Sequence, residues 1–294
     1  MQKVLFIVNP ISGNRDKASV VDIVRRKLDK SRYISEFVYT EYQGHATELA
    51  ASTDADIVVA VGGDGTVNEV ARGVAGTQKI FGLIPCGSGD GLALHLGIRR
   101  NAEFAVDVIN GGFVMAMDYA EVCGKPFFCT AGMGLDALVS YKFAQSSTRG
   151  LKSYIIDALK IEREFKPERY DIVSDGGNWS GQAAMVTVAN VNQWGNHALI
   201  APGASVSDGL LDISIVKPFH EADIPLLAHR LMHGTLYRSR LFETIRASEV
   251  KITRESPGPM HRDGDPCEMG TELFFKVIPS AMKVMIPIDK DKQI

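Results

Sequence analysis

The sequence predicts a two-domain protein, with an N-terminal doubly wound α/β domain followed by a C-terminal, mainly antiparallel β-sandwich domain. Three observations predict this fold class. Short apolar runs alternate with amphipathic stretches in the first third of the chain, β-rich stretches follow Gly111 and Gly112, and 294 residues suffice for two cores. We therefore expect an α/β domain over residues 1–112 and a β-rich domain over residues 113–294, whose last strand is free to return to the first domain.

The first domain is predicted from alternating strand and helix signals. Buried strands are expected at 4–8, 36–40, 56–61 and 80–84, and helices at 16–30, 46–52, 66–74 and 102–109. This βαβα order favours a parallel sheet with helices on both faces. In such sheets, ligands bind beyond the carboxyl ends of the strands.

The second domain is predicted mainly from β-rich runs. Strands are expected at 114–122, 127–131, 170–174, 183–191, 211–216, 250–253, 273–277 and 283–286. Helices are expected at 135–143, 151–165 and 223–233. So few helices among so many strands indicate a sandwich or a barrel-like pair of sheets.

Composition excludes several classes of protein. A net charge of -3, with 45% hydrophobic and 23% charged residues, indicates a globular chain and gives no global reason to bind nucleic acid. The four cysteines form neither a CxxC pair nor a zinc-finger spacing, so we expect reduced thiols. The apolar run 4–8 ends at Asn9-Pro10 and no apolar run reaches spanning length, so we expect no signal peptide, no transmembrane segment and a cytoplasmic location.

The segment from the third expected strand into its helix carries the clearest chemistry. Gly62, Gly63 and Gly65 let the backbone turn tightly and approach phosphate oxygens, and the helix N-terminus favours anions. Asp64 lies between these glycines, where a carboxylate can hold Mg²⁺. The plainer interpretation is a strand-to-helix turn with Thr66 as a helix cap.

Two further loops at strand ends have a similar composition. Residues 9–13 follow the first strand and residues 85–91 follow the fourth, and both offer Gly with polar side chains. Because the carboxyl ends of parallel strands meet at one edge of a sheet, we expect the three loops to converge.

The motifs in these loops occur in a characteristic order and spacing: Asn9-Pro10-x-Ser12-Gly13, Gly62-Gly63-Asp64-Gly65-Thr66-Val67-Asn68-Glu69 and Pro85-x-Gly87-Ser88-Gly89. They resemble the diacylglycerol-kinase catalytic-domain superfamily, which includes bacterial lipid kinases and sphingosine and ceramide kinases. The resemblance covers essentially the whole chain. It continues in Ala131-Gly132-Met133-Gly134-Leu135-Asp136-Ala137, Ile200-Ala201-Pro202-x-Ala204, Ser207-Asp208-Gly209-Leu210-Leu211-Asp212 and Asp263-Gly264-Asp265.

The resemblance implies that the first domain binds ATP. The residues expected to contact the nucleotide are Asn9, Thr40, Gly62, Gly63, Asp64, Gly65, Thr66, Val67, Asn68 and Ser88. By the same likeness, Asp64 organises the catalytic Mg²⁺ and is a candidate for deprotonating the substrate hydroxyl.

The family's late acidic motif matches Asp263-Gly264-Asp265, where the second acid is usually Glu. A general base must come within hydrogen-bond reach of the hydroxyl, so the shorter Asp265 leaves Asp64, Asp263 and Asp265 as alternatives. Asp-Gly is also a strong hairpin signal, so the segment is equally expected to form a turn.

Bacterial members hold a second, structural Mg²⁺ near their Asp-Gly-Leu motif. By position, its ligands fall on the carboxylate of Asp208 and the backbone carbonyls of Ser205 and Leu210. Oxygen ligands of this kind suit Mg²⁺ and also Ca²⁺. The alternative is a plain turn before a strand.

The sequence therefore predicts an ATP- and Mg²⁺-dependent lipid kinase that meets its lipid, of diacylglycerol or sphingoid type, at the membrane surface. Ser88, Asp90 and Gly91 depart from the diacylglycerol-kinase pattern of Thr, Asn and Asp and look more like the sphingosine and ceramide kinase variant. An NAD kinase-like enzyme and a non-catalytic nucleotide-binding regulator are the competing hypotheses. The identity of the lipid, the general base and the oligomeric state, a homodimer included, stay open.

Overall fold

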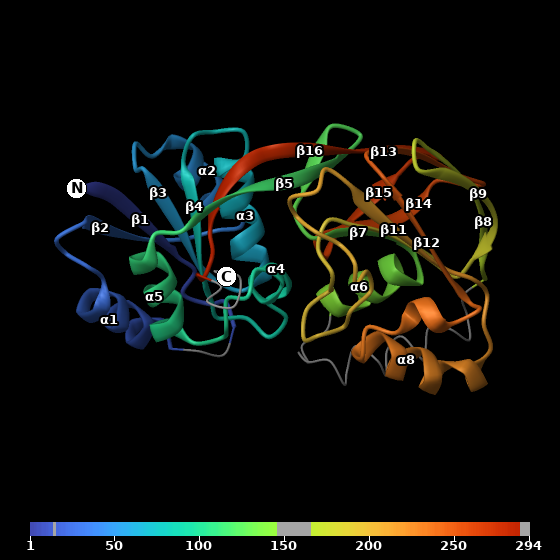
Figure 1. Ribbon diagram of the computed structural model, residues 1–294, viewed down its shortest axis with the longest axis horizontal. Coiled ribbons are helices and arrows are strands. Elements are labelled where there is room, and N and C mark those ends of the chain that lie inside the picture. The colour runs from blue at the N-terminus through green and yellow to red at the C-terminus, as the bar shows by residue number, and fades with distance from the viewer. Residues whose placement is uncertain (14–15, 146–165, 289–294) are drawn as a thin grey trace, which may run out of the picture. The chain divides into compact units, whose positions relative to one another are not determined.

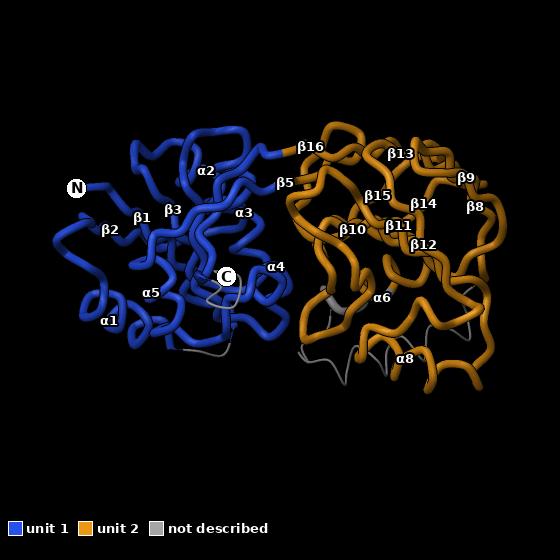
Figure 2. Tube along the Cα trace, viewed as in Figure 1, with its two compact units in different colours: residues 1–117, 280–294 blue, residues 118–279 orange. Residues whose placement is uncertain are grey.

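The computed structural model describes residues 1–13, 16–145 and 166–288 of the chain. The chain forms two compact units, residues 1–117 with 280–294 and residues 118–279, which Figure 2 shows in different colours. The chain passes between the units within two strands, β5 (Val114–Val122) and β16 (Glu272–Met285). The sequence becomes β-rich after residue 112, slightly before the unit boundary at residue 117, because β5 begins in the first unit and continues into the second.

The first unit is built on a parallel sheet with the strand order β2, β1, β3, β4. The end of β16 pairs in parallel with β4 through Lys283 and Val284. Helix α1 packs with α5 and α2 packs with α3, as Figure 1 shows. The elements are β1 (Gln2–Val8), α1 (Lys17–Lys27), β2 (Tyr33–Tyr39), α2 (His45–Ser52), β3 (Ile57–Gly62), α3 (Asp64–Val74), β4 (Ile80–Pro85), α4 (Gly91–His95) and α5 (Ala102–Gly111).

The central strands of this sheet explain its apolar sequence runs. Every residue of β3 is buried, as are residues 4–8 of β1, because parallel strands covered on both faces exclude water. The strands also end in register, with Val8 opposite Val61 and Gly62 opposite Pro85. The loops that follow β1, β3 and β4 therefore leave the sheet at the same edge.

The second unit contains two layers of antiparallel strands. One layer has the order β12, β11, β10, β7, β14, β15, and the other contains β16, β13, β8 and β9. Besides β5 and β16, the elements are β6 (Lys125–Phe127), β7 (Thr130–Gly134), α6 (Leu135–Gln145), β8 (Glu168–Ser174), β9 (Gly177–Ala183), β10 (Met185–Ala189), β11 (Leu211–Val216), η1 (Glu221–Asp223), α8 (Ile224–Met232), η2 (Leu236–Arg238), β12 (Phe242–Ala247), β13 (Glu249–Arg254), β14 (Gly258–Arg262) and β15 (Asp265–Met269).

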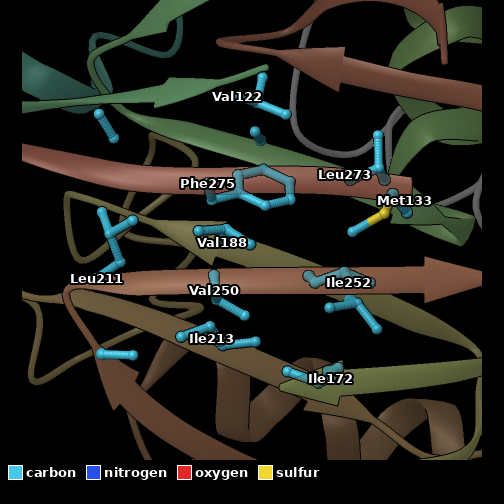
Figure 3. Close-up of a cluster of buried hydrophobic side chains, with 14 of the residues drawn as sticks. Val122, Met133, Ile172, Val188, Leu211, Ile213, Val250, Ile252, Leu273 and Phe275 are labelled. Carbon is cyan, nitrogen blue, oxygen red and sulfur yellow. The ribbon is translucent and has the colours of Figure 1, made fainter. Parts of the chain in front are cut away.

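A single apolar core joins the two layers of the second unit (Figure 3). Val188 and Ile213 come from one layer, and Ile172, Val250 and Phe275 come from the other. Each such side chain contributes roughly 1.5–3 kcal/mol on full burial. The predicted fold class, an α/β domain followed by a β-sandwich domain, is confirmed.

Some elements differ from the sequence predictions. The helix expected over 151–165 lies outside the described residues. The short helix α4 and strands β6, β9, β12, β14 and β15 were not expected, because their sequences are short, polar or rich in Gly and Pro. Within the described ranges, no helix has the length and apolar character needed to cross a membrane.

Candidate functional site

Three loops at the edge of the parallel sheet are tied together by side-chain hydrogen bonds. The Asn9 side chain, just after β1, donates from Nδ2 to Thr66 Oγ1 in α3 over 3.0 Å. The Asn9 backbone N–H donates to Val61 O over 3.1 Å, and Cys86 N donates to Gly62 O over 2.7 Å. The expected convergence of the loops after β1, β3 and β4 is therefore present in the first unit.

Glycine makes the close approach of these loops possible. A Cβ atom on Gly13, where φ is +65°, would lie 1.9 Å from the carbonyl oxygen of Cys86. A Cβ on Gly87 would lie 2.8 Å from the Cα of Gly63. Since real Cβ contacts are never so short, larger residues would push the three loops apart.

Asp64 joins the loop after β3 to the loop after β4. It is the first residue of α3 and is partly buried. Its carboxylate accepts the backbone N–H of Asp90 and that of Gly91, each over 2.8 Å. Burial raises the pKa of Asp64, and these two N–H groups oppose the rise.

Asp90 and Arg100 form a second brace on the loop after β4. Asp90 has φ +48°, its side chain is 0% exposed, and its carboxylate accepts from Gly87 N over 2.9 Å and from Arg100 Nε over 3.0 Å. Arg100 Nη2 also donates to the carbonyl oxygens of Ser88 and Gly89. Burial, followed by the nearby charge of Asp64, raises the pKa of Asp90 to about 6. Two neighbouring acids with raised pKa values are typical of functional sites.

The other residues expected to contact a nucleotide are distributed around these loops. Thr40 follows β2, and its N–H donates to Val8 O over 2.9 Å. Gly65 and Ser88 are exposed, whereas Thr66, Val67 and Asn68 are buried in α3. A ligand at the sheet edge would therefore meet the backbone of the glycine loops and the side chains of Asn9, Asp64 and Ser88 first.

The acidic turn of the second unit connects β14 to β15. Asp263, with φ +51°, has a carboxylate that accepts the backbone N–H groups of Phe128, Cys129 and Thr130. Asp265, the first residue of β15, is half-buried and lies opposite Arg262. The Asp263 carboxylate thus anchors the turn to the segment before β7, while Asp265 begins the outgoing strand.

Beneath this turn lies a buried polar cluster that the sequence did not single out. His261 Nε2 lies 2.9 Å from Asp136 Oδ1, and Thr187 Oγ1 donates to Asp136 Oδ2 over 2.6 Å. Gly264 N, in the turn, donates to His261 Nδ1 over 3.2 Å. A Cβ on Gly132 would lie 1.9 Å from Asp136 Oδ2, so this glycine makes room for the cluster. The motif containing Asp136 and the turn are therefore in contact through His261.

The carboxylate expected to hold a structural metal is paired with an arginine side chain. Asp208 Oδ1 accepts from Leu210 N over 3.1 Å, and Asp208 Oδ2 accepts from Arg246 Nη2. The Ser205 hydroxyl accepts from Ser207 N over 3.4 Å. A guanidinium on the carboxylate does not fit a divalent cation on the same oxygen, because both are positively charged. No group of three or more His, Cys, Asp or Glu residues in the described part of the chain is arranged as a metal site.

Two family models match the chain, one for each part. The model of the diacylglycerol kinase catalytic domain matches residues 3–122. The model of the YegS C-terminal NAD kinase beta sandwich-like domain matches residues 129–286, more than half of the chain. Together they span both units.

Curated relatives match over nearly their whole length. A diacylglycerol kinase of Bacillus subtilis (strain 168) is 27% identical over 302 residues, covering 100% of this chain and 99% of the relative. A probable lipid kinase YegS-like protein of Citrobacter koseri is 27% identical over 276 residues, covering 92% of this chain and 86% of the relative.

Solved structures share the fold. A putative diacylglycerol kinase from Bacillus anthracis str. Sterne aligns with a TM-score of 0.79 at 24% identity, covering 98% of this chain and 97% of that one. An NAD kinase from Archaeoglobus fulgidus in complex with ATP aligns with a TM-score of only 0.54 at 12% identity, covering 96% of this chain and 93% of that one. The NAD kinase is thus the more distant in fold.

Proposed function

We propose that this chain, which belongs to the diacylglycerol kinase family, is a kinase that transfers the γ-phosphate of ATP to a hydroxyl group of a lipid. The observation that carries the proposal is the position of Asp64. Its carboxylate begins α3 within one glycine loop and accepts two N–H groups of another, so both loops are fixed around one acid. Phosphoryl transfer depends chiefly on such positioning and on charge neutralisation.

The three loops would hold the phosphates of ATP. The glycines let the backbone of these loops approach phosphate oxygens closely, and the N-terminus of α3 adds a favourable field. Asn9 and Ser88 offer polar side chains beside them. Ser88 is exposed, and its loop is held in shape by the hydrogen bonds that Arg100 donates to Asp90 and to the Ser88 carbonyl oxygen.

Mg²⁺ fits the chemistry of Asp64. Each carboxylate oxygen accepts one N–H group and keeps a lone pair, and Mg²⁺ in phosphoryl-transfer sites commonly takes one or two carboxylates together with phosphate oxygens. When bound, the ion would neutralise phosphate charge. Its positive charge would also favour the ionised carboxylate and offset the raised pKa of Asp64.

Asp265 is the acid that we propose takes the proton of the lipid hydroxyl. Asp263 is the weaker candidate, because three backbone N–H groups engage its carboxylate and stabilise the charged form. Asp64 is not assigned this role, because we propose that it holds the metal. Asp265 is held in place by the turn that Asp263 anchors.

The substrate is proposed to be a lipid of diacylglycerol or sphingoid type, met at a membrane surface. This proposal is supported by the relatives, which are named diacylglycerol kinase and probable lipid kinase. The competing hypothesis, an NAD kinase-like enzyme, is favoured only by the shared fold. A non-catalytic nucleotide-binding regulator is the remaining alternative.

One assay separates these three functions. The purified chain is incubated with ATP and Mg²⁺ alone, with NAD, and with micelles containing diacylglycerol, sphingosine or ceramide, and ADP release is followed. We expect ADP release that depends on one of the lipids. Release that depends on NAD would support the competing enzyme, and no release above the ATP-only rate with any acceptor would favour a non-catalytic protein.

A further inference from the structure

Arg246 bridges two acidic residues, Asp208 in the loop before β11 and Asp212 in β11 itself. Its Nη2 donates to Asp208 Oδ2, and its Nε lies 3.3 Å from Asp212 Oδ2. Arg246 lies on β12 directly opposite Asp212 on β11, so the pairing of the two strands fixes the position of its backbone. The guanidinium of Arg246, on the neighbouring strand β12, therefore contacts both carboxylates.

A buried acid closes the same loop from another side. Asp118, which is 1% exposed, accepts Gly209 N at Oδ2 over 2.8 Å, and its own N–H donates to Val206 O over 2.6 Å. Gly209 has φ +71°, a conformation that glycine adopts without strain. Asp118 and Arg246 together thus hold the segment from Val206 to Asp212.

Three carboxylates lie around this segment, with Asp118 in β5, Asp208 in the loop and Asp212 in β11, and their charge needs a compensating cation. The side chain of Asp212 is only 4% exposed, so water screens its charge poorly. Arg246 supplies a permanent charge with several donors in a fixed fork, which suits two carboxylates at once. A divalent cation on the same oxygens would lie within a few ångströms of the guanidinium and would be repelled by it.

We propose that Arg246 is the cation that stabilises this loop, and that the loop therefore needs no divalent metal. The family resemblance of the sequence implies a metal here, held by Asp208 with the carbonyls of Ser205 and Leu210. The side chain of Arg246 takes the place of that metal. The proposal concerns the fold of the second unit and does not depend on the proposed function.

The test is thermal unfolding of the full chain without nucleotide, in EDTA and in millimolar Mg²⁺ or Ca²⁺. The wild type is expected to melt at the same temperature in all three conditions. Arg246→Met is expected to melt roughly 3–8 °C lower, because two acids lose their shared partner. Lys217→Met is the matched control: it removes the ion pair between Lys217 and Glu243 near the other end of the same two strands, which involves no buried acid such as Asp212, and should melt close to the wild type.

Two results would overturn the proposal. One is a wild-type melting temperature that rises with Mg²⁺ or Ca²⁺ and loses this response in Asp208→Ala. The other is an Arg246→Met protein that melts like the wild type or like Lys217→Met. If Arg246→Met fails to fold, calorimetric titration of the wild type with Ca²⁺ and Mg²⁺ decides: the absence of a site that Asp208→Ala removes supports the proposal, and its presence refutes it.

Discussion

At the scale of single residues, the two acids of the turn between β14 and β15 are held differently: the Asp263 carboxylate accepts three backbone N–H groups, whereas Asp265 begins β15. The distinction between Asp263 and Asp265 depends on backbone N–H groups about 135 residues earlier in the chain. No local pattern could show that contact, so the sequence left the two acids as alternatives, and Asp265 as the general base is our proposal.

The two acids of the turn should respond differently to substitution. Asp265→Asn is expected to lower kcat by about 10²–10⁴-fold with little change in ATP affinity, because a positioned general base is lost. Asp265→Glu should retain activity, since it restores the acid usual in the family. The measurements are kcat, ATP Kd and melting temperature.

Asp263→Ala is the comparison for these variants. It should mainly lower stability, by about 2 kcal/mol or more, because three backbone N–H groups lose a charged acceptor. A fully active Asp265→Asn enzyme would remove Asp265 from the catalytic residues.

At the scale of elements, strand ends and glycine loops were predictable, and the side chains that brace them were not. The loop after β4 was identified from its Gly and Ser residues and its place after an apolar strand. Arg100 was missed, because a lone arginine ten residues after Asp90 belongs to no motif. Its role is visible only from its bonds to Asp90, Ser88 and Gly89.

Arg100 is expected to position the phosphate-binding loop for ATP. Arg100→Met should raise the KM for ATP by about tenfold or more with a smaller effect on kcat, since charge-assisted hydrogen bonds commonly contribute about 1.5–3 kcal/mol. Arg99→Met is the matched control, because the exposed Arg99 side chain lies over the ring of Phe104 instead. The readout is steady-state kinetics with ATP varied, together with melting temperature.

A purely structural role for Arg100 would give a different pattern. Arg100→Met would then melt at a lower temperature while its folded fraction kept the wild-type KM for ATP. Equal KM changes in Arg99→Met and Arg100→Met would also contradict the positioning role.

At the scale of the whole molecule, the order of strands and helices was enough to predict an α/β domain followed by a sandwich. The sequence did not show that 273–277 and 283–286 belong to one 14-residue strand, β16. Pro279 and Ser280, the latter with φ +52°, interrupt the apolar pattern and suggest a turn. The strand nevertheless continues past this interruption, because it pairs with β13 on one side of it and with β4 on the other.

We propose that this molecule moves the γ-phosphate of ATP onto a lipid hydroxyl. The most direct measurement is mass spectrometry of lipids extracted after incubation with Mg²⁺ and ATP labelled with heavy oxygen in its γ-phosphate. Asp64→Asn serves as the control, because an amide keeps the shape of the loop and loses the charge proposed to hold Mg²⁺. We predict a labelled lipid phosphate from the wild type and none above background from folded Asp64→Asn. An unlabelled lipid pool with the wild type, or equal labelling by both proteins, would contradict the account.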